Sequence, residues 1–181
     1  MKFKASTICL LIFNLLAVIY LLLPTPQLKD LDSSVRSQEP GDTVQMTNVT
    51  GHYTNLSRRE VMNFYRSFYS GPFMVRLNYP PEYAKTIFRD TMQSYYLEEF
   101  HLPFKESLFI NGYEWAEDVF TKPEKRIQNK LLYNDIEYRA KINTKIIPTS
   151  IPARFLAFFT TEIAIIFVIF LYKKFWRQNF A

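Results

Sequence analysis

Hydrophobic and polar positions alternate along residues 136–146, where each apolar side chain is followed by a charged or polar one. The positions of the predicted packed face are Ile136, Tyr138, Ala140, Ile142, Thr144 and Ile146. A period of two predicts a β-strand with one packed face and one solvated face. Pro148 and Pro152 follow, and proline has no N–H to donate to a sheet ladder, so the strand is predicted to end there.

Two long apolar runs lie near the ends of the chain. Residues 155–172 have about the length that crosses a bilayer. Residues 1–23 begin with Lys2 and Lys4, turn apolar and end without a small-x-small cleavage site, which favours an uncleaved signal anchor over a cleaved signal peptide. The sequence therefore predicts two transmembrane helices, 1–23 and 155–172, the second preceded by a proline hinge at 148–154.

Basic residues flank both apolar runs and predict their orientation. These residues are Lys2, Lys4, Lys173, Lys174 and Arg177, the last three in a basic tail at 173–181. Positive charge collects on the cytoplasmic side, so both termini are expected in the cytoplasm and the middle of the chain outside it. Four basic residues before the second run oppose this orientation: Arg139, Lys141, Lys145 and Arg154. Long translocated segments follow the charge rule weakly, so these four basic residues carry less weight in the predicted orientation. The aromatic residues at the two apolar boundaries, placed as interfacial anchors, are Tyr20, Tyr172, Phe175 and Trp176.

The intervening segment divides into a linker and one domain. Residues 24–56 are rich in Ser, Asp, Gln, Thr and Pro and are predicted to form a flexible polar linker. The domain, 57–147, begins with a capping box made by Ser57 and Glu60, followed by an apolar stripe at helical spacing. A second helix is predicted after Pro80-Pro81. Its apolar face would consist of Tyr83, Ala84, Ile87, Phe88, Met92 and Tyr95.

Strand signals complete the domain. Residues 73–79 are predicted as a strand, and Asn111-Gly112 as the two-residue turn of a hairpin, because that pair supplies the positive φ of a type I′ turn. A short helix is expected at 122–129. The order predicts an α+β fold, in which a small antiparallel or mixed sheet of about four strands has helices on one face. An N-terminal and a C-terminal transmembrane helix flank this domain.

Charge excludes one class of function. The net charge is +5, but residues 24–154 hold 17 basic and 16 acidic residues, so the excess lies at the membrane flanks. Nucleic-acid binding is not expected, because its signature is a concentrated basic patch. The single cysteine, Cys9, lies in the first apolar run, so no disulfide forms within one chain.

Three polar residues inside the apolar runs, Glu162, Asn14 and Thr161, are the first candidate site and are predicted to make a polar contact within the membrane. Glu162 follows Thr161 near the middle of the second run, where a carboxyl costs several kcal/mol unless protonated or paired. Asn14 is the midpoint of the apolar residues 5–23 of the first run. Antiparallel helices would bring both to one depth, so a protonated Glu162 is predicted to hydrogen-bond Asn14, in the same chain or a neighbouring one, with a contribution of about 1 kcal/mol. The alternatives are separate solvation of the two residues, contact with another membrane protein, and a proton or ion role.

Catalytic motifs are scarce. The sequence has no glycine-rich phosphate loop, nucleophile elbow or cysteine pair, so neither enzymatic activity nor a cofactor is expected. The motif Glu98-x-x-His101 has the spacing of carboxylate and imidazole that metal sites in helical bundles use. Such sites need this motif from two helices, and the sequence contains it once. A solvated helix end is therefore the favoured interpretation of these two residues.

Three classes of function remain. The first is a membrane-anchored interaction or assembly protein that lies in the lipid bilayer and binds a membrane-protein partner, or itself, through its helices. The second is an accessory factor for surface-polysaccharide export. The chain is similar in outline to polysaccharide co-polymerases, with two spans, an external α+β domain and prolines before the second span (Pro148 and Pro152). It has neither their long helical arm nor a glycine-rich second span. The third is an extracytoplasmic enzyme that uses scattered residues such as Glu98, Glu99 and His101.

Overall fold

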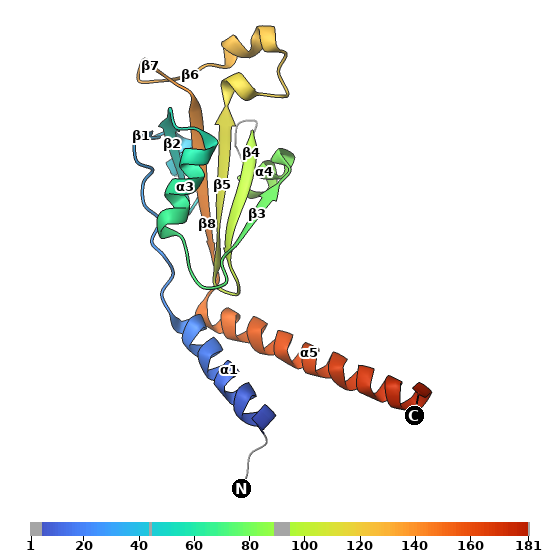
Figure 1. Ribbon diagram of the computed structural model, residues 1–181. Helices are drawn as coiled ribbons and strands as arrows, with labels where there is room; N and C mark the ends of the chain where they lie inside the picture. Colours follow the sequence, from blue (N-terminus) through green and yellow to red (C-terminus); the bar gives the residue numbers. More distant parts are fainter. Residues whose placement is uncertain (1–4, 44, 89–94, 181) are drawn as a thin grey trace. The chain divides into compact units, whose positions relative to one another are not determined.

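The computed structural model describes residues 5–43, 45–88 and 95–180 of the chain. It divides into two compact units, which are treated separately below. One unit combines Met1–Thr25 with Thr149–Ala181, and the other is Pro26–Pro148. The larger unit is built on a β-sheet and the smaller one on two helices (Figure 1).

A six-stranded sheet forms the larger unit, in the order β1-β2-β8-β5-β4-β3, and all neighbouring strands are antiparallel. The strands are β1 (Ser34–Arg36), β2 (Val49–Thr54), β3 (Val75–Tyr79), β4 (Tyr96–Leu102), β5 (Glu106–Glu114) and β8 (Ala140–Pro148). Two more strands, β6 (Leu131–Tyr133) and β7 (Ile136–Tyr138), pair with each other. The predicted α+β class is confirmed, with more strands than the sequence indicated.

Strand β2 lies in the segment predicted to be a flexible linker, and that prediction is wrong. Its register with β8 runs from Val49 opposite Lys145 to Thr54 opposite Ala140. Most of its side chains are buried although several are polar, including His52 and Thr54. A buried strand with polar side chains shows no apolar alternation, so the hydrophobic pattern did not reveal it.

Helix α3 (Arg58–Phe68) begins where the capping box predicted. The Ser57 hydroxyl accepts from the backbone N–H of Glu60, and a Glu60 carboxylate oxygen accepts from the Ser57 N–H at 2.8 Å. The amphipathic helix buries Val61, Met62 and Tyr65. These side chains pack on one face of the sheet. The sheet residues on this face include Phe100, Leu108, Ile110, Ala140 and Ile142.

The opposite face of the sheet carries its own short helices, so the prediction of helices on one face is wrong. Helix α4 (Ala84–Ile87) follows the 3-10 helix η1 (Pro81–Tyr83). Ala84 and Phe88 belong to a second core cluster with Val49, Leu97 and Phe109. Helix α2 (Pro40–Thr43) contacts β2. The predicted second helix is thus much shorter than expected; Met92 lies outside the described residues.

Asn111 and Gly112 lie within the continuous strand β5, so the predicted hairpin turn there is wrong. Neither residue has a positive φ, and both pair with residues of β8 and β4. The chain reverses instead between β4 and β5, where Phe104 has a φ of 63°. Local turn propensity is overridden because two neighbouring strands hold this segment extended.

The predicted strand 136–146 is divided at Arg139 into β7 and β8. In β8 the predicted packed face, with Ala140, Ile142 and Thr144, is buried as expected. The prediction of a solvated opposite face is wrong there, because Lys141 and Asn143 are buried as well. Ile136 is exposed, because β7 pairs only with β6 and lies outside the main sheet. The predicted short helix at 122–129 is the 3-10 helix η3 (Pro123–Asn129), which follows η2 (Trp115–Glu117).

The smaller unit consists of α1 (Ala5–Leu22) and α5 (Ile151–Phe180). Of the described helices, α5 alone is long and apolar enough to cross a membrane, over Ile151–Gln178. The apolar part of α1, Thr7–Leu22, is shorter. Pro148 is the last residue of β8, as predicted, but Pro152 lies in the first turn of α5, where proline is tolerated. Only Thr149 and Ser150 lie between β8 and α5, so the bounds predicted for the hinge, 148–154, are wrong.

Candidate functional site

A polar contact joins α1 and α5 within the smaller unit. The Asn14 side-chain amide donates to Glu162 Oε1 at 2.9 Å and to the Leu10 carbonyl at 3.1 Å. The rings of Phe13 and Phe158 lie beside it, with centroids 6.2 Å apart. The hydrogen bond that the sequence predicted is thus present, and it forms within one chain.

Thr161 does not take part in this contact, contrary to the sequence prediction. Its hydroxyl donates to the Ala157 carbonyl at 2.8 Å, one turn earlier in its own helix. Such a bond satisfies the hydroxyl locally and leaves it no role between the helices. The sequence could not show this, because Thr161 and Glu162 are neighbours in the chain but point from α5 in different directions.

Arg154 makes a second contact between the two helices. Its guanidinium donates to the Leu21 carbonyl at 3.1 Å and to the Thr149 carbonyl at 2.9 Å, and the residue is buried. The last carbonyls of a helix have no partner within the helix, so Arg154 satisfies one of them at the end of α1. Sequence reasoning treated Arg154 only as a charge before the membrane and missed this role.

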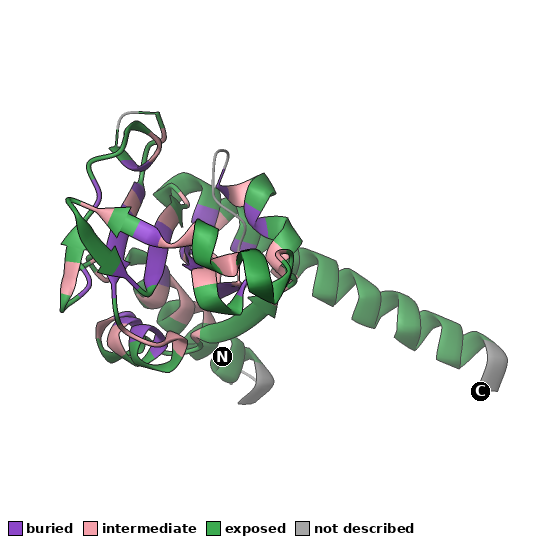
Figure 2. Cartoon of the chain, turned by 90° about the horizontal axis from the view of Figure 1, so that it is seen from above, coloured by how far each residue is buried: buried purple, intermediate pink, exposed green. Residues whose placement is uncertain are grey.

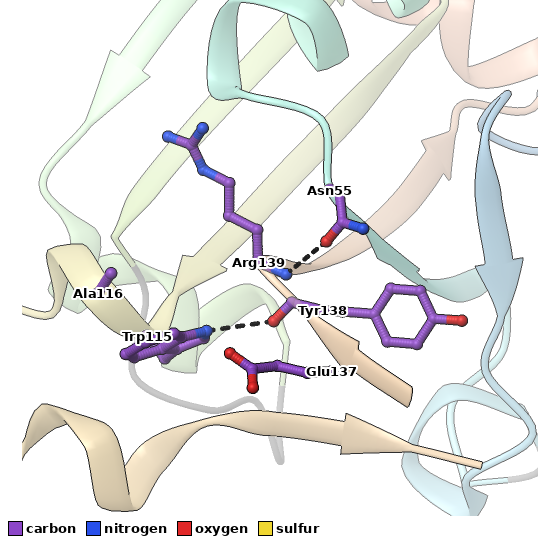
Figure 3. A pocket seen from close by; sticks show the side chains of 6 residues that line it. All are labelled: Asn55, Trp115, Ala116, Glu137, Tyr138 and Arg139. Atoms are coloured by element: carbon purple, nitrogen blue, oxygen red, sulfur yellow. Dashed lines mark hydrogen bonds between the residues drawn. The ribbon is translucent and has the colours of Figure 1, made fainter. Parts of the chain in front are cut away.

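A cleft of about 250 Å³ opens at one end of the larger unit (Figure 3). Its lining comes from three segments that are distant in sequence: Asn55, then Trp115 and Ala116, then Glu137, Tyr138 and Arg139. Two hydrogen bonds tie these segments together. The Trp115 indole donates to the Tyr138 carbonyl at 3.2 Å, and the Arg139 backbone N–H donates to Asn55 Oδ1 at 2.9 Å.

Two ion pairs lie near this cleft, and the cation of one of them lies over the Trp115 ring. The Arg139 guanidinium lies 3.0 Å from Glu114 Oε2, and Glu114 is buried. Lys130 Nζ lies 2.8 Å from Glu137 Oε2 and 5.3 Å from the Trp115 ring centroid. An aromatic face beside paired charges and exposed backbone can hold a polar ligand that has a flat apolar side. The sequence signal was weak, because Arg139 looks like an ordinary solvated position in an alternating strand.

The favoured interpretation of Glu98 and His101 as a solvated helix end is wrong, because both residues lie in strand β4 and Glu98 is buried. The helical spacing of the weaker metal alternative is absent for the same reason. Residues three apart in a strand point to opposite faces. Glu98 is fully buried and accepts from Arg58 Nε at 2.8 Å and from Arg76. His101 Nδ1 lies 2.9 Å from Ser107 Oγ on the other face. In the described part of the chain, no three His, Cys, Asp or Glu side chains gather as a metal site would require.

A buried charge cluster on the second face of the sheet also escaped sequence reasoning. Lys141 Nζ lies 2.8 Å from Asp42 Oδ2 and 2.5 Å from Glu39 Oε2. Burial by itself lowers the pKa of Lys141, but its hydrogen bonds to Asp42 and Glu39 raise that pKa above the ordinary value. Burial, followed by the hydrogen bond to Glu39, raises the pKa of Tyr53 to about 12. The buried ammonium of Lys141 is paired with both carboxylates, so the cluster fits a structural role.

The membrane-flanking basic residues are only partly described. Lys173, Lys174 and Arg177 are exposed on the last turns of α5, whereas Lys2 and Lys4 lie outside the described residues.

No protein-family model, curated protein or solved structure matches this chain.

Proposed function

We propose that this protein is a two-pass membrane-anchored interaction or assembly protein with an extracytoplasmic α+β domain. The exposed apolar surface of α5 supports the membrane anchor. Most large apolar side chains along this helix are exposed on all of its sides (Figure 2). They include Leu156, Ile163, Ile166, Phe167, Phe170 and Leu171. A helix that is apolar all round requires an apolar environment, and a bilayer provides one.

The contact of Asn14 with Glu162 supports α1 as the second span and is the observation that carries the proposal. Eighteen residues of α1 extend about 27 Å at 1.5 Å per residue, close to the roughly 30 Å of a hydrocarbon core. A carboxyl and an amide in hydrocarbon stabilise each other by bonding across helices. Basic residues in the last turns of α5, and Lys2 and Lys4 at the start of the chain, favour a cytoplasmic location for both termini.

The cleft around Trp115 supports an interaction role for the domain. We propose that this cleft binds a polypeptide segment of a partner protein on the extracytoplasmic side. The indole face would pack on an apolar side chain, and Arg139 and Glu137 would meet polar groups of that segment. Aromatic and arginine side chains around a hollow are the residue types that contribute most to protein–protein binding.

Photo-crosslinking in native membranes tests this proposal. A photoreactive residue replaces Ala116 in the cleft, and in a matched control it replaces the exposed Lys85. We expect a discrete adduct from position 116, weakened by Trp115→Ala, and none from position 85. An adduct from α5, for example from position 166, with none from 116 would place the interaction in the membrane and contradict the role of the cleft.

A further inference from the structure

The C-terminal end of α5 has a hollow of its own. The helix continues past the apolar run, and Tyr172, Lys173, Trp176 and Arg177 line a volume of about 400 Å³. These positions are one and four residues apart, so they lie on one side of the helix. The rings of Tyr172 and Trp176 have centroids 6.3 Å apart. The hollow therefore combines an aromatic wall with two cations.

The two cations of this hollow have no acidic neighbour. No Asp or Glu follows Glu162 in the chain, and within the described residues neither Lys173 nor Arg177 forms an ion pair. Like charges four residues apart on a helix repel each other. An anion bound between them would remove this repulsion and accept hydrogen bonds from both side chains.

Helix geometry places the hollow at the level of lipid headgroups if α5 spans the bilayer. Arg154 and Lys173 are 19 residues apart, and at 1.5 Å per residue that separation is about 28 Å. This matches a hydrocarbon core of about 30 Å. Tyr172 and Trp176 then lie in the interface, where aromatic residues concentrate.

We propose that Lys173 and Arg177, flanked by Tyr172 and Trp176, bind the phosphate-bearing headgroup of an anionic phospholipid. The inference rests on the proposed membrane anchoring by α5 and adds a specific site to it. The planar guanidinium donates two parallel hydrogen bonds to phosphate oxygens, and the ammonium adds a point charge. A zwitterionic lipid carries its own cation beside the phosphate, so the site favours anionic lipid.

The experiment uses Trp176 as the reporter, in full-length protein carrying Trp115→Phe so that no other tryptophan fluoresces. The protein is reconstituted in vesicles of equal parts phosphatidylglycerol and phosphatidylcholine, in which one lipid or the other is brominated. We expect brominated phosphatidylglycerol to quench Trp176 about threefold more strongly. Lys173→Gln with Arg177→Gln should remove this preference.

Lys174→Gln is the matched control, because Lys174 is the adjacent basic residue and does not line the hollow. It should keep the preference for the anionic lipid. Equal quenching by both lipids in the parent protein, or an equal loss in Lys174→Gln, would overturn the headgroup site but leave the membrane anchor standing. Quenching by neither lipid would overturn the anchoring of α5. Loss of the preference on adding glycerol phosphate, but not sodium chloride of equal ionic strength, would assign the site to soluble phosphate and overturn the lipid proposal.

Discussion

The ring of Tyr96 lies directly over Gly112, its partner across β4 and β5. A Cβ at position 112 would overlap the Tyr96 ring, far closer than van der Waals contact allows, and Tyr96 is almost fully buried. The Arg58 guanidinium lies 4.8 Å from the centroid of the same ring. Gly112 is therefore required by packing in the middle of a strand, and not by a turn.

Gly112→Ala should destabilise the domain by about 1–3 kcal/mol, because the added methyl group must displace a buried ring. The free energy of unfolding can be measured by urea titration in detergent on the full chain carrying Trp176→Phe, so that Trp115 alone gives the fluorescence signal. Adding Tyr96→Leu should make the double variant less destabilised than the sum of the two single changes. Strict additivity would show that the ring is not what excludes a side chain at 112.

The buried Glu98 should depend strongly on its two arginines. Replacing Arg58 and Arg76 together by Met leaves a buried carboxylate without partners, which should cost about 3–5 kcal/mol. Glu98→Gln should cost less, because both arginines are partly exposed and can turn to water. Urea titration of the three proteins tests this asymmetry. A larger loss in Glu98→Gln than in the double arginine variant would contradict it.

The stability of the domain should fall between pH 7.5 and pH 5 because of His52. Burial lowers the pKa of His52 by more than the hydrogen bond and charge of Asp30 raise it, so the net pKa lies below about 6.5. His52 therefore binds a proton more readily in the unfolded chain than in the folded chain, and protonation favours unfolding. This contribution is fully present above pH 6.5 and is lost as the pH falls through the folded pKa.

The comparison of His52→Gln with the parent protein checks this pH dependence. Urea titrations at pH 7.5, 6.0 and 5.0 should show a shallower fall of the unfolding free energy in His52→Gln than in the parent. His101→Gln is the matched control, because it removes the other histidine of the chain. If the two variants change the pH dependence equally, burial of His52 is not its cause.

Asn14 and Glu162 should show a coupling free energy of about 0.5–2 kcal/mol when both are changed to Leu. Unfolding in mixed micelles with increasing dodecyl sulfate measures each single variant and the double variant. The exchanged pair, Asn14→Glu with Glu162→Asn, should recover most of the lost stability. Thr161→Val should change little, because that hydroxyl bonds to its own helix. No coupling would mean that the hydrogen bond contributes nothing in the micelle.

The sequence by itself determined the features that depend on neighbouring residues or on length. The capping box of Ser57 and Glu60 is satisfied within four residues, so it was readable before the fold was known. The apolar length of α5 and the proline at the end of β8 are equally local. Even the contact of Asn14 with Glu162 followed from the midpoints of two apolar runs of similar length, residues 5–23 and 155–172.

Only the tertiary structure decided the features that depend on distant strands. Strand β2 exists because β8 pairs with it, and the Thr50 and Thr144 hydroxyls bond across that pair at 2.7 Å. Asn111-Gly112 has the composition of a turn, yet strands on both sides keep it extended. The cleft needs three separate segments to meet at Arg139. Strand register and burial arise from cooperative pairing along whole strands. A short window of sequence contains only one of the two strands that pair, so it does not show where its partner lies.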